Sequence, residues 1–331
     1  MTSQRRSALG LLALLTLKIP GLVRAQTGGR VHRIGVLSLN RAASPVAQFE
    51  ATAVRAALHD AGYEVGRNLH VEVRYAEADA ARLDGLAEEL VRLDVALILA
   101  IANLPVEAAM RATRRIPIVM VSASLPVELG YVASLARPGG NVTGTAWATV
   151  EMSGKVLQIL NEAAPRARRI ALLATATAPG TQNYRVENRS AAQALGLTLQ
   201  VFDLSTAEPL QATLQRVAAS RPDALFVVGE GVIGTHLGDI VTFAAQRKLV
   251  AIGVTPQFIQ AGGALYYGPN LNSLVARTVS YVDRILKGAR PTDLPVELPS
   301  KFDLIINLKA LRAMGLTVPQ ALLLRADEVI D

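Results

Sequence analysis

From Val31 onward the sequence alternates short apolar runs, typical of buried strands, with longer amphipathic segments, typical of helices. In the first half these segments are, in order, a strand at 33–39, a helix at 45–61, a strand at 69–75, a helix at 79–93, a strand at 95–101, a helix at 106–114 and a strand at 116–121. Because parallel strands need crossover connections, this order predicts a parallel sheet with helices on both faces.

The same pattern restarts after a turn cluster at 137–141 and a short extended piece at 142–147. Its segments are a helix at 151–163, a strand at 169–175, a helix at 181–195, a strand at 197–202, a helix at 207–220, a strand at 224–228, a helix at 234–248 and a strand at 250–254. The sequence therefore predicts a second doubly wound unit of similar size.

A third region follows, with a long helix at 272–287, a strand at 302–306 and a short helix at 308–313. Such a region after two complete units indicates that the chain crosses between them more than once. We expect an α/β protein with two doubly wound parallel-sheet lobes joined by a multi-stranded hinge. The expected boundaries are 30–146 with 266–297 returning to it for lobe I, 147–265 for lobe II, and 298–331 packing across the hinge or on lobe II.

The first 25 residues have the layout of a secretory signal peptide. Arg5 and Arg6 precede a continuous apolar run at 8–17, and Val23-Arg24-Ala25 places small residues where a signal peptidase cleaves. The run lacks the 3.6-residue period of an amphipathic helix, and it is shorter than the roughly 20 residues that span a bilayer. We expect export to a periplasm-like space, by either the general or the twin-arginine route.

Composition narrows the function classes. The chain has 34 Lys and Arg against 27 Asp and Glu, a net charge of +7; cleavage after Ala25 removes four basic and no acidic residues, leaving 7 − 4 = +3. This small excess predicts no nucleic-acid partner. The absence of cysteine excludes disulfides, thiolate metal sites, a cysteine nucleophile and a thioether-linked lipid anchor, so we expect a freely diffusing protein.

Polar residues follow several of the predicted strands. Ligands of open parallel sheets bind beyond the carboxyl ends of the strands, so these residues are candidate ligand contacts. They are Ser38, Asn40, Asn103, Ser122 and Ser124 in the first unit, and Thr175, Thr177 and Thr255 in the second. Ordinary helix capping by Ser and Asn explains the first group equally well. Trp147, Tyr184 and Tyr267 are candidate walls for an aromatic ligand, with core packing as the alternative.

Several long segments carry a family resemblance. They are 132–144 (VASLARPGGNVTG), 262–271 (GGALYYGPNL), 281–291 (YVDRILKGARP) and the closing stretch from Asp293. With these segments the chain resembles the substrate-binding proteins of ABC transporters, in the family whose better-studied members look like tryptophan, tyrosine or phenylalanine receptors. The resemblance implies a type I periplasmic binding fold that holds a ligand between two lobes, with a membrane permease and an ATPase as partners.

The resemblance also bears on single residues. The family commonly has an acid at the position of Glu230, which makes Glu230 the candidate partner for a ligand ammonium group. Relatives carry Asp where this chain has Leu125, and Asn-Pro where it has Thr175-Ala176-Thr177. Both differences remove polar or turn-forming groups near the expected cleft, so the ligand class stays open between aromatic amino acids and related carboxylates.

We therefore expect a periplasmic, monomeric receptor that binds a small molecule and catalyses no reaction. The alternatives are a ligand-binding sensor subunit that feeds a signalling partner, and an enzyme on the same scaffold. The G-x-G-x-x-G motif at 229–234 lacks the acidic residue that a dinucleotide site needs about 20 residues later. The four histidines have no metal-binding spacing, so we expect neither a cofactor nor a metal.

We predict that Glu230→Gln weakens the binding of an amino acid, because the neutral amide forms a weaker hydrogen bond with an ammonium group. The expected loss is about 1.5–3 kcal/mol, measured by isothermal titration calorimetry with L-tryptophan, L-tyrosine and L-phenylalanine. Unchanged affinity for the amino acid that binds would remove Glu230 from the site.

Overall fold

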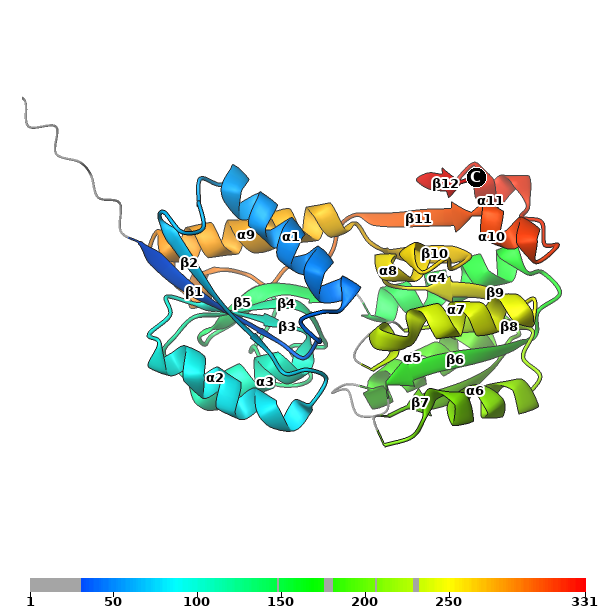
Figure 1. Cartoon of the computed structure of the whole chain (residues 1–331), viewed down its shortest axis with the longest axis horizontal. Helices are drawn as coiled ribbons and strands as arrows, with labels where there is room; N and C mark the ends of the chain where they lie inside the picture. Colours follow the sequence, from blue (N-terminus) through cyan, green and yellow to red (C-terminus); the bar gives the residue numbers. More distant parts are fainter. Residues whose placement is uncertain (1–30, 148, 176–180, 206, 229–231) are drawn as a thin grey trace, which may run out of the picture. The chain divides into compact units, whose positions relative to one another are not determined.

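The computed structural model describes residues 31–147, 149–175, 181–205, 207–228 and 232–331. The predicted signal peptide at 1–25 lies outside these ranges. Within them the chain forms two β-sheets with helices on both faces of each (Figure 1).

The first sheet has five parallel strands in the order β2-β1-β3-β4-β5. Its strands are β1 (His32–Ser38), β2 (Leu69–Tyr75), β3 (Ile98–Ile101), β4 (Ile118–Ser124) and β5 (Val142–Trp147). The order reverses direction at β1, and this is where open α/β sheets bind ligands.

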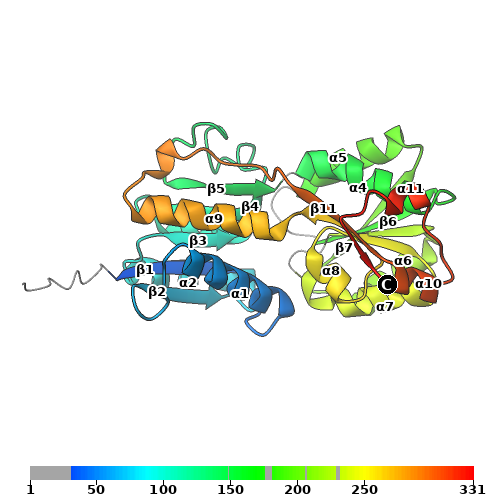
Figure 2. The same ribbon diagram turned by 90° about the horizontal axis from the view of Figure 1, so that it is seen from above.

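Two pairs of helices cover this sheet. One face carries α2 (Leu83–Arg92) and α3 (Asn103–Ala112), and the other carries α1 (Pro45–Asp60) and α9 (Leu271–Leu286). Figure 2 shows α1 and α9 side by side over the strands. The face toward α1 and α9 is apolar because alternate residues of each strand point the same way, for example Ile34 and Val36 in β1.

The second sheet has seven strands in the order β12-β11-β10-β9-β8-β6-β7. Its strands are β6 (Arg169–Thr175), β7 (Thr198–Leu204), β8 (Ala224–Val227), β9 (Val250–Gly253), β10 (Leu265–Pro269), β11 (Phe302–Asn307) and β12 (Glu328–Ile330). Only the β10–β11 pair among these is antiparallel. The sheet is therefore mostly parallel, with a mixed edge.

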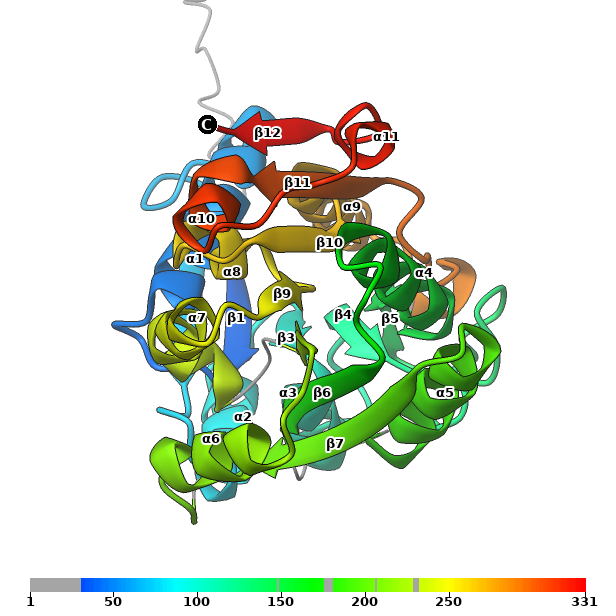
Figure 3. The same ribbon diagram turned by 90° about the vertical axis from the view of Figure 1, so that its right-hand side faces the viewer.

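Helices also cover both faces of the second sheet. Figure 3 shows α4 and α5 on one face and α6, α7 and α8 on the other. The helices near this sheet are α4 (Thr149–Ala163), α5 (Thr181–Ala194), α6 (Leu210–Ala219), α7 (Leu237–Gln246), α8 (Pro256–Gln260), α10 (Leu308–Ala313) and α11 (Gln320–Leu323).

The chain passes between the two sheets three times: after β5, between β10 and α9, and again before β11. The last passage is tied to β5, because the Glu297 N–H donates to the Gly144 carbonyl (3.1 Å) and the Ala146 N–H donates to the Glu297 carbonyl (2.9 Å). These passages agree with the repeated crossing that the third region of the sequence indicates.

The α/β fold class predicted from the sequence, with two doubly wound sheets, is confirmed. The last region, 302–331, adds β11 and β12 to the second sheet, and β10 keeps residues 265–269 in that sheet. We propose the two sheets with their covering helices as the two lobes, and we place the second crossing after Pro269 rather than at 266.

Candidate ligand-binding site

A cavity of about 610 Å³ lies at the carboxyl ends of strands from both sheets. Ser38 at the end of β1 lines it, together with Thr175 at the end of β6 and Thr255 just after β9. Its volume falls within the range of roughly 300–1,000 Å³ that is typical of small-molecule sites. The cavity is therefore the candidate ligand-binding site.

The structure brings eight of the residues predicted from the sequence into the lining of this cavity. They are Ser38, Asn40, Asn103, Ser122, Ser124, Trp147, Thr175 and Thr255. Thr177 and Glu230, which the sequence also predicts, lie outside the described residues. Contact between any of these residues and a ligand stays a prediction.

Two of the predicted aromatic walls lie elsewhere. Tyr184 lies edge-on to Phe226, with ring centroids 6.5 Å apart, and Tyr267 stacks on Phe302 at 5.8 Å. Both tyrosines pack against the core of the second sheet and do not appear among the described residues that line the cavity. For these two residues the packing alternative describes the contacts that the structure shows.

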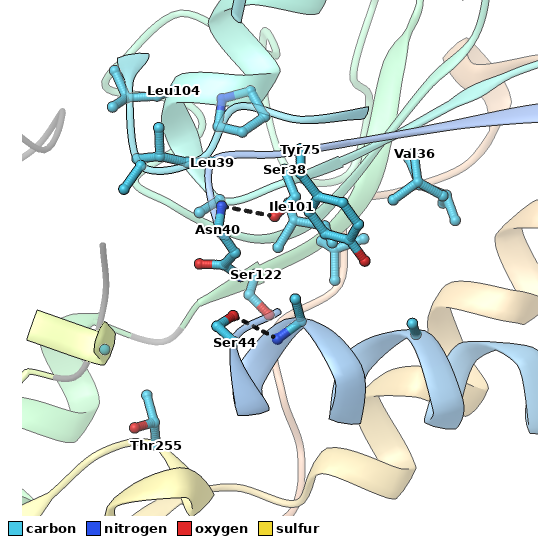
Figure 4. Close-up of a pocket in the computed structure, with 18 of the residues that line it drawn as sticks. Val36, Ser38, Leu39, Asn40, Ser44, Tyr75, Ile101, Leu104, Ser122 and Thr255 are labelled. Atoms are coloured by element: carbon cyan, nitrogen blue, oxygen red, sulfur yellow. Dashed lines mark hydrogen bonds between the residues drawn. The ribbon is translucent and has the colours of Figure 1, made fainter. Parts of the chain in front are cut away.

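Some predicted polar residues hold the loops of the site in place. The Ser38 hydroxyl accepts a hydrogen bond from the Asn40 N–H at 3.2 Å (Figure 4). The Asn103 side chain reaches across to the end of β4: its Oδ1 accepts from the Ser124 N–H (2.7 Å) and its Nδ2 donates to the Ser124 carbonyl (3.2 Å). Asn103 therefore links the start of α3 to the end of β4.

Thr255 differs from these residues. Its Oγ1 atom is buried and has no hydrogen-bond partner among the described residues, although the residue lines the cavity. A buried hydroxyl without a partner costs roughly 1–3 kcal/mol. A ligand atom that pairs with Thr255 Oγ1 would recover this cost, so the hydroxyl is suited to ligand recognition.

The backbone around the cavity adopts conformations that side-chain-bearing residues rarely take. Ala78 (φ 64°), Ala102 (φ 65°) and Ser122 (φ 57°) all line the cavity and have positive φ. Each such residue costs on the order of 1–3 kcal/mol and persists only where its surroundings enforce it. Strain of this kind gathers at ligand clamps, which supports the same location for the site.

The strain at Ser122 has a visible cause. The pairing of β4 with β5 shifts register between Met120 and Ala123, and the Ser122 N–H donates to Thr145 Oγ1 at 3.3 Å. At the neighbouring position of β5, Gly144 has φ +126°, and a Cβ there would lie 2.2 Å from the Met120 carbonyl oxygen. The glycine therefore permits the close approach that turns Ser122 toward the cavity.

The lining is largely apolar, with few charges. Arg55 and Asp79 are the two charged residues among the described part of the lining, and both are exposed. The more deeply placed polar groups are hydroxyls and amides. This arrangement favours recognition by hydrogen bonds and apolar contact.

Sequence reasoning missed several lining residues, among them Ser44, Tyr75 and Thr235. Ser44 is the N-cap of α1, where its Oγ accepts from the Ala47 N–H at 3.2 Å (Figure 4). Tyr75 is the last residue of β2, so the strand-end rule that selected Ser38 could also have selected it.

Two lobe-sized parallel sheets and a cavity at their strand ends define a type I periplasmic binding fold. A sequence profile described as ABC transporter substrate binding protein matches residues 45–330. The chain therefore belongs to the family of ABC transporter substrate-binding proteins.

Known proteins resemble this chain in sequence or in fold. The chain is 25% identical over 276 residues to a tyrosine-binding protein from Clostridioides difficile, covering 82% of this chain and 79% of that protein. Its fold matches an L-Trp complex from Streptococcus pneumoniae with a TM-score of 0.83 and 23% identity, covering 90% and 99% of the two chains. It also matches the leucine-binding protein LivK of Thermotoga maritima with a TM-score of 0.56 and 13% identity, covering 80% and 78%.

We predict that Asn103→Ala destabilises the protein, because two partly buried backbone groups of Ser124 lose their side-chain partner. The free energy of unfolding should fall by about 1–3 kcal/mol in urea titrations. Asn272→Ala, at an exposed position of α9, is the matched control. An equal effect of the two substitutions would show that Asn103 does not stabilise the end of β4.

Proposed function

We propose that this protein is the periplasmic solute-binding receptor of an ABC importer, and that it closes its two lobes around an aromatic amino acid or a related carboxylate. Family membership and the cavity shared by both sheets support this proposal. Ligand contacts from both sheets would favour the closed arrangement of the lobes, and the closed form would dock on the permease.

The observation that carries the proposal is the composition of the cavity wall. Hydroxyls and amides from the strand ends of both sheets line the cavity, and Thr255 offers a hydroxyl that has no hydrogen-bond partner among the described residues. Such groups orient a small polar ligand, while the apolar lining accepts its side chain. The relatives named for tyrosine and for L-Trp support an aromatic amino acid as the first ligand to test.

The location and partners of the protein follow from the same proposal. Proteins of this family are normally periplasmic or extracellular. None of the helices in the described part of the chain has the length and apolar character that crossing a bilayer requires. We propose that residues 1–25 direct export, that the mature protein is a monomer, and that its partners are a membrane permease with its ATPase.

A receptor that feeds a sensor is the second candidate, because it would need the same cavity and the same closure. Uptake of radiolabelled ligand separates the two: cells lacking this protein lose uptake if it serves an importer, and keep uptake while losing the response if it serves a sensor.

We predict that an aromatic amino acid raises the melting temperature of the mature protein. A ligand that binds only the folded state at 100 times its Kd adds about 2.7 kcal/mol of stability. The measurement is a thermal-shift assay with L-tryptophan, L-tyrosine and L-phenylalanine, with glucose as the control. A melting temperature that none of the three amino acids changes would reject this ligand class.

We further predict that Thr255→Val has opposite effects on stability and on binding. Removing a buried hydroxyl that has no hydrogen-bond partner within the described ranges should stabilise the ligand-free protein by about 1 kcal/mol. The same substitution should weaken the binding of the amino acid that gives the thermal shift by about 0.5–1.5 kcal/mol, measured by calorimetry. Thr255→Ser keeps the hydroxyl and should keep the affinity; a Val variant that binds as tightly as the Ser variant would contradict the assignment.

A further inference from the structure

The cavity does not stop at the strand ends, because it continues into the space between α1, α9 and the first sheet. Its wall there includes Val36 and Val73 on the sheet, Ala51 and Val54 on α1, and Val275 on α9. We call this part the apolar compartment. In Figure 4, Val36 and Tyr75 project from the strands into the space beside α1.

Part of the sheet face that lines the compartment is only partly buried. On the sheet face that α1 and α9 cover, Ile34 and Leu97 are fully buried near the amino ends of their strands. Farther along the same face, Val36, Val73 and Val121 are only partly buried. Both faces of a parallel sheet are normally covered, so this partial exposure of valines in and beside the central strands marks space that protein atoms do not fill.

The sequence of α1 explains the space. Positions 47, 51, 54 and 58 of the helix all line the cavity and lie on one helical face. They are Ala47 and Ala51 nearer the strand ends, then Val54 and Leu58 nearer the far end. Ala47 and Leu58 are each 1% exposed, whereas Ala51 between them is only partly buried, so the small side chain of Ala51 leaves room beside the sheet.

At the far end of the compartment, a side-chain hydrogen bond links the segment just after α1 to α9. Tyr63, just after α1, donates from its hydroxyl to Asp283 Oδ1 of α9 at 2.9 Å. Burial and the Asp283 carboxylate raise the pKa of Tyr63 to about 12, so this hydrogen bond persists throughout the physiological pH range. This hydrogen bond therefore fixes α1 and α9 to each other at one end of the apolar compartment, and the other end of the compartment opens toward the polar groups at the strand ends.

The polar groups at the strand ends and the apolar compartment belong to one continuous cavity, and this indicates the kind of molecule that fits it. The polar groups of Ser38, Ser122 and Thr255 and the apolar compartment line the same space. Arg55 and Asp79, the charged residues in the described lining, are exposed. One molecule with a polar end and an apolar chain would satisfy both parts at once.

We propose that the apolar compartment receives the apolar chain of the ligand whose polar end lies at the strand ends. The protein then selects small amphiphilic amino acids or carboxylates by the length of their apolar chain. This inference rests on the proposed receptor function and adds the part of the cavity that sets ligand size.

The first experiment fills the compartment by substitution and measures the binding of the neutral fluorescent probe N-phenyl-1-naphthylamine. This probe has no ammonium or carboxylate group, so its binding does not depend on the contacts that an amino acid would make at the strand ends. Wild-type protein should bind the probe with enhanced fluorescence, and Ala51→Leu should weaken binding at least about tenfold. Ala56→Leu makes the same change at an exposed position of α1 and should bind like wild type. Absent binding to wild type, or equal binding by the two variants, would overturn the inference.

A second variant guards against misfolding of the first. Val73→Phe fills the compartment from the sheet side, and circular dichroism with thermal melting checks that each variant is folded. Loss of probe binding in folded Val73→Phe supports the inference independently of α1, and full probe binding in that variant counts against it.

A homologous ligand series separates this inference from the proposed function. Calorimetry compares 2-aminobutyrate, norvaline, norleucine and 2-aminooctanoate with butyrate, hexanoate and octanoate. Each buried methylene should strengthen binding about fourfold, and Ala51→Leu should remove the gain of the longest members. Amino acids that bind without any dependence on chain length would sustain the receptor function and reject the compartment. Chain-length dependence among the carboxylates alone would sustain the compartment and reject amino-acid specificity.

Discussion

The structure depends on a chain that passes three times between two mostly parallel sheets. A sheet of parallel strands collects its strand ends on one edge, and the repeated crossing allows ends from both sheets to line one cavity. The third crossing is not a loose linker, because Thr143 Oγ1 donates to the Leu294 carbonyl at 2.6 Å and the Val296 N–H donates to the Leu135 carbonyl at 2.7 Å. These bonds place the crossing segment alongside β5, whose last residue lines the site.

The site stores unfavourable free energy that the remainder of the fold offsets. Ala102 and Ser122, which have positive φ, line the cavity, and so does Thr255, whose hydroxyl has no hydrogen-bond partner in the part of the chain that the structure describes. The enforcing contacts are backbone hydrogen bonds from neighbouring strands, such as the Ala102 N–H to the Val121 carbonyl at 2.9 Å. A protein optimised for stability alone would remove these features, so their presence in the cavity wall agrees with selection for binding.

Much of the fold could be predicted from the sequence, because strand and helix periods are local. The predicted strands at 69–75 and 169–175 and the extended piece at 142–147 have the observed bounds, whereas the sequence did not predict α11 and β12, because each is too short to show a repeating pattern. At the site, the strand-end rule predicted Ser38 and Thr255, which line the cavity, and their contact with a ligand stays a prediction. Aromatic character alone pointed to Tyr184 and Tyr267, which pack on Phe226 and Phe302 instead. The neighbours of an aromatic ring are long-range, and no local pattern encodes them.

The apolar compartment shows why ligand size is the least predictable property of such a protein. The period of α1 indicates which face is apolar, but it does not fix the distance between that face and the sheet. That distance depends on what α9, more than 200 residues later, places beside α1, including the contact between Tyr63 and Asp283. Polar recognition at strand ends can therefore be common to a fold, while side chains such as Ala51 and Val73 adjust the depth of the cavity in one chain. Specificity within the family would then change by substitution at apolar positions, with the polar end of the site left intact.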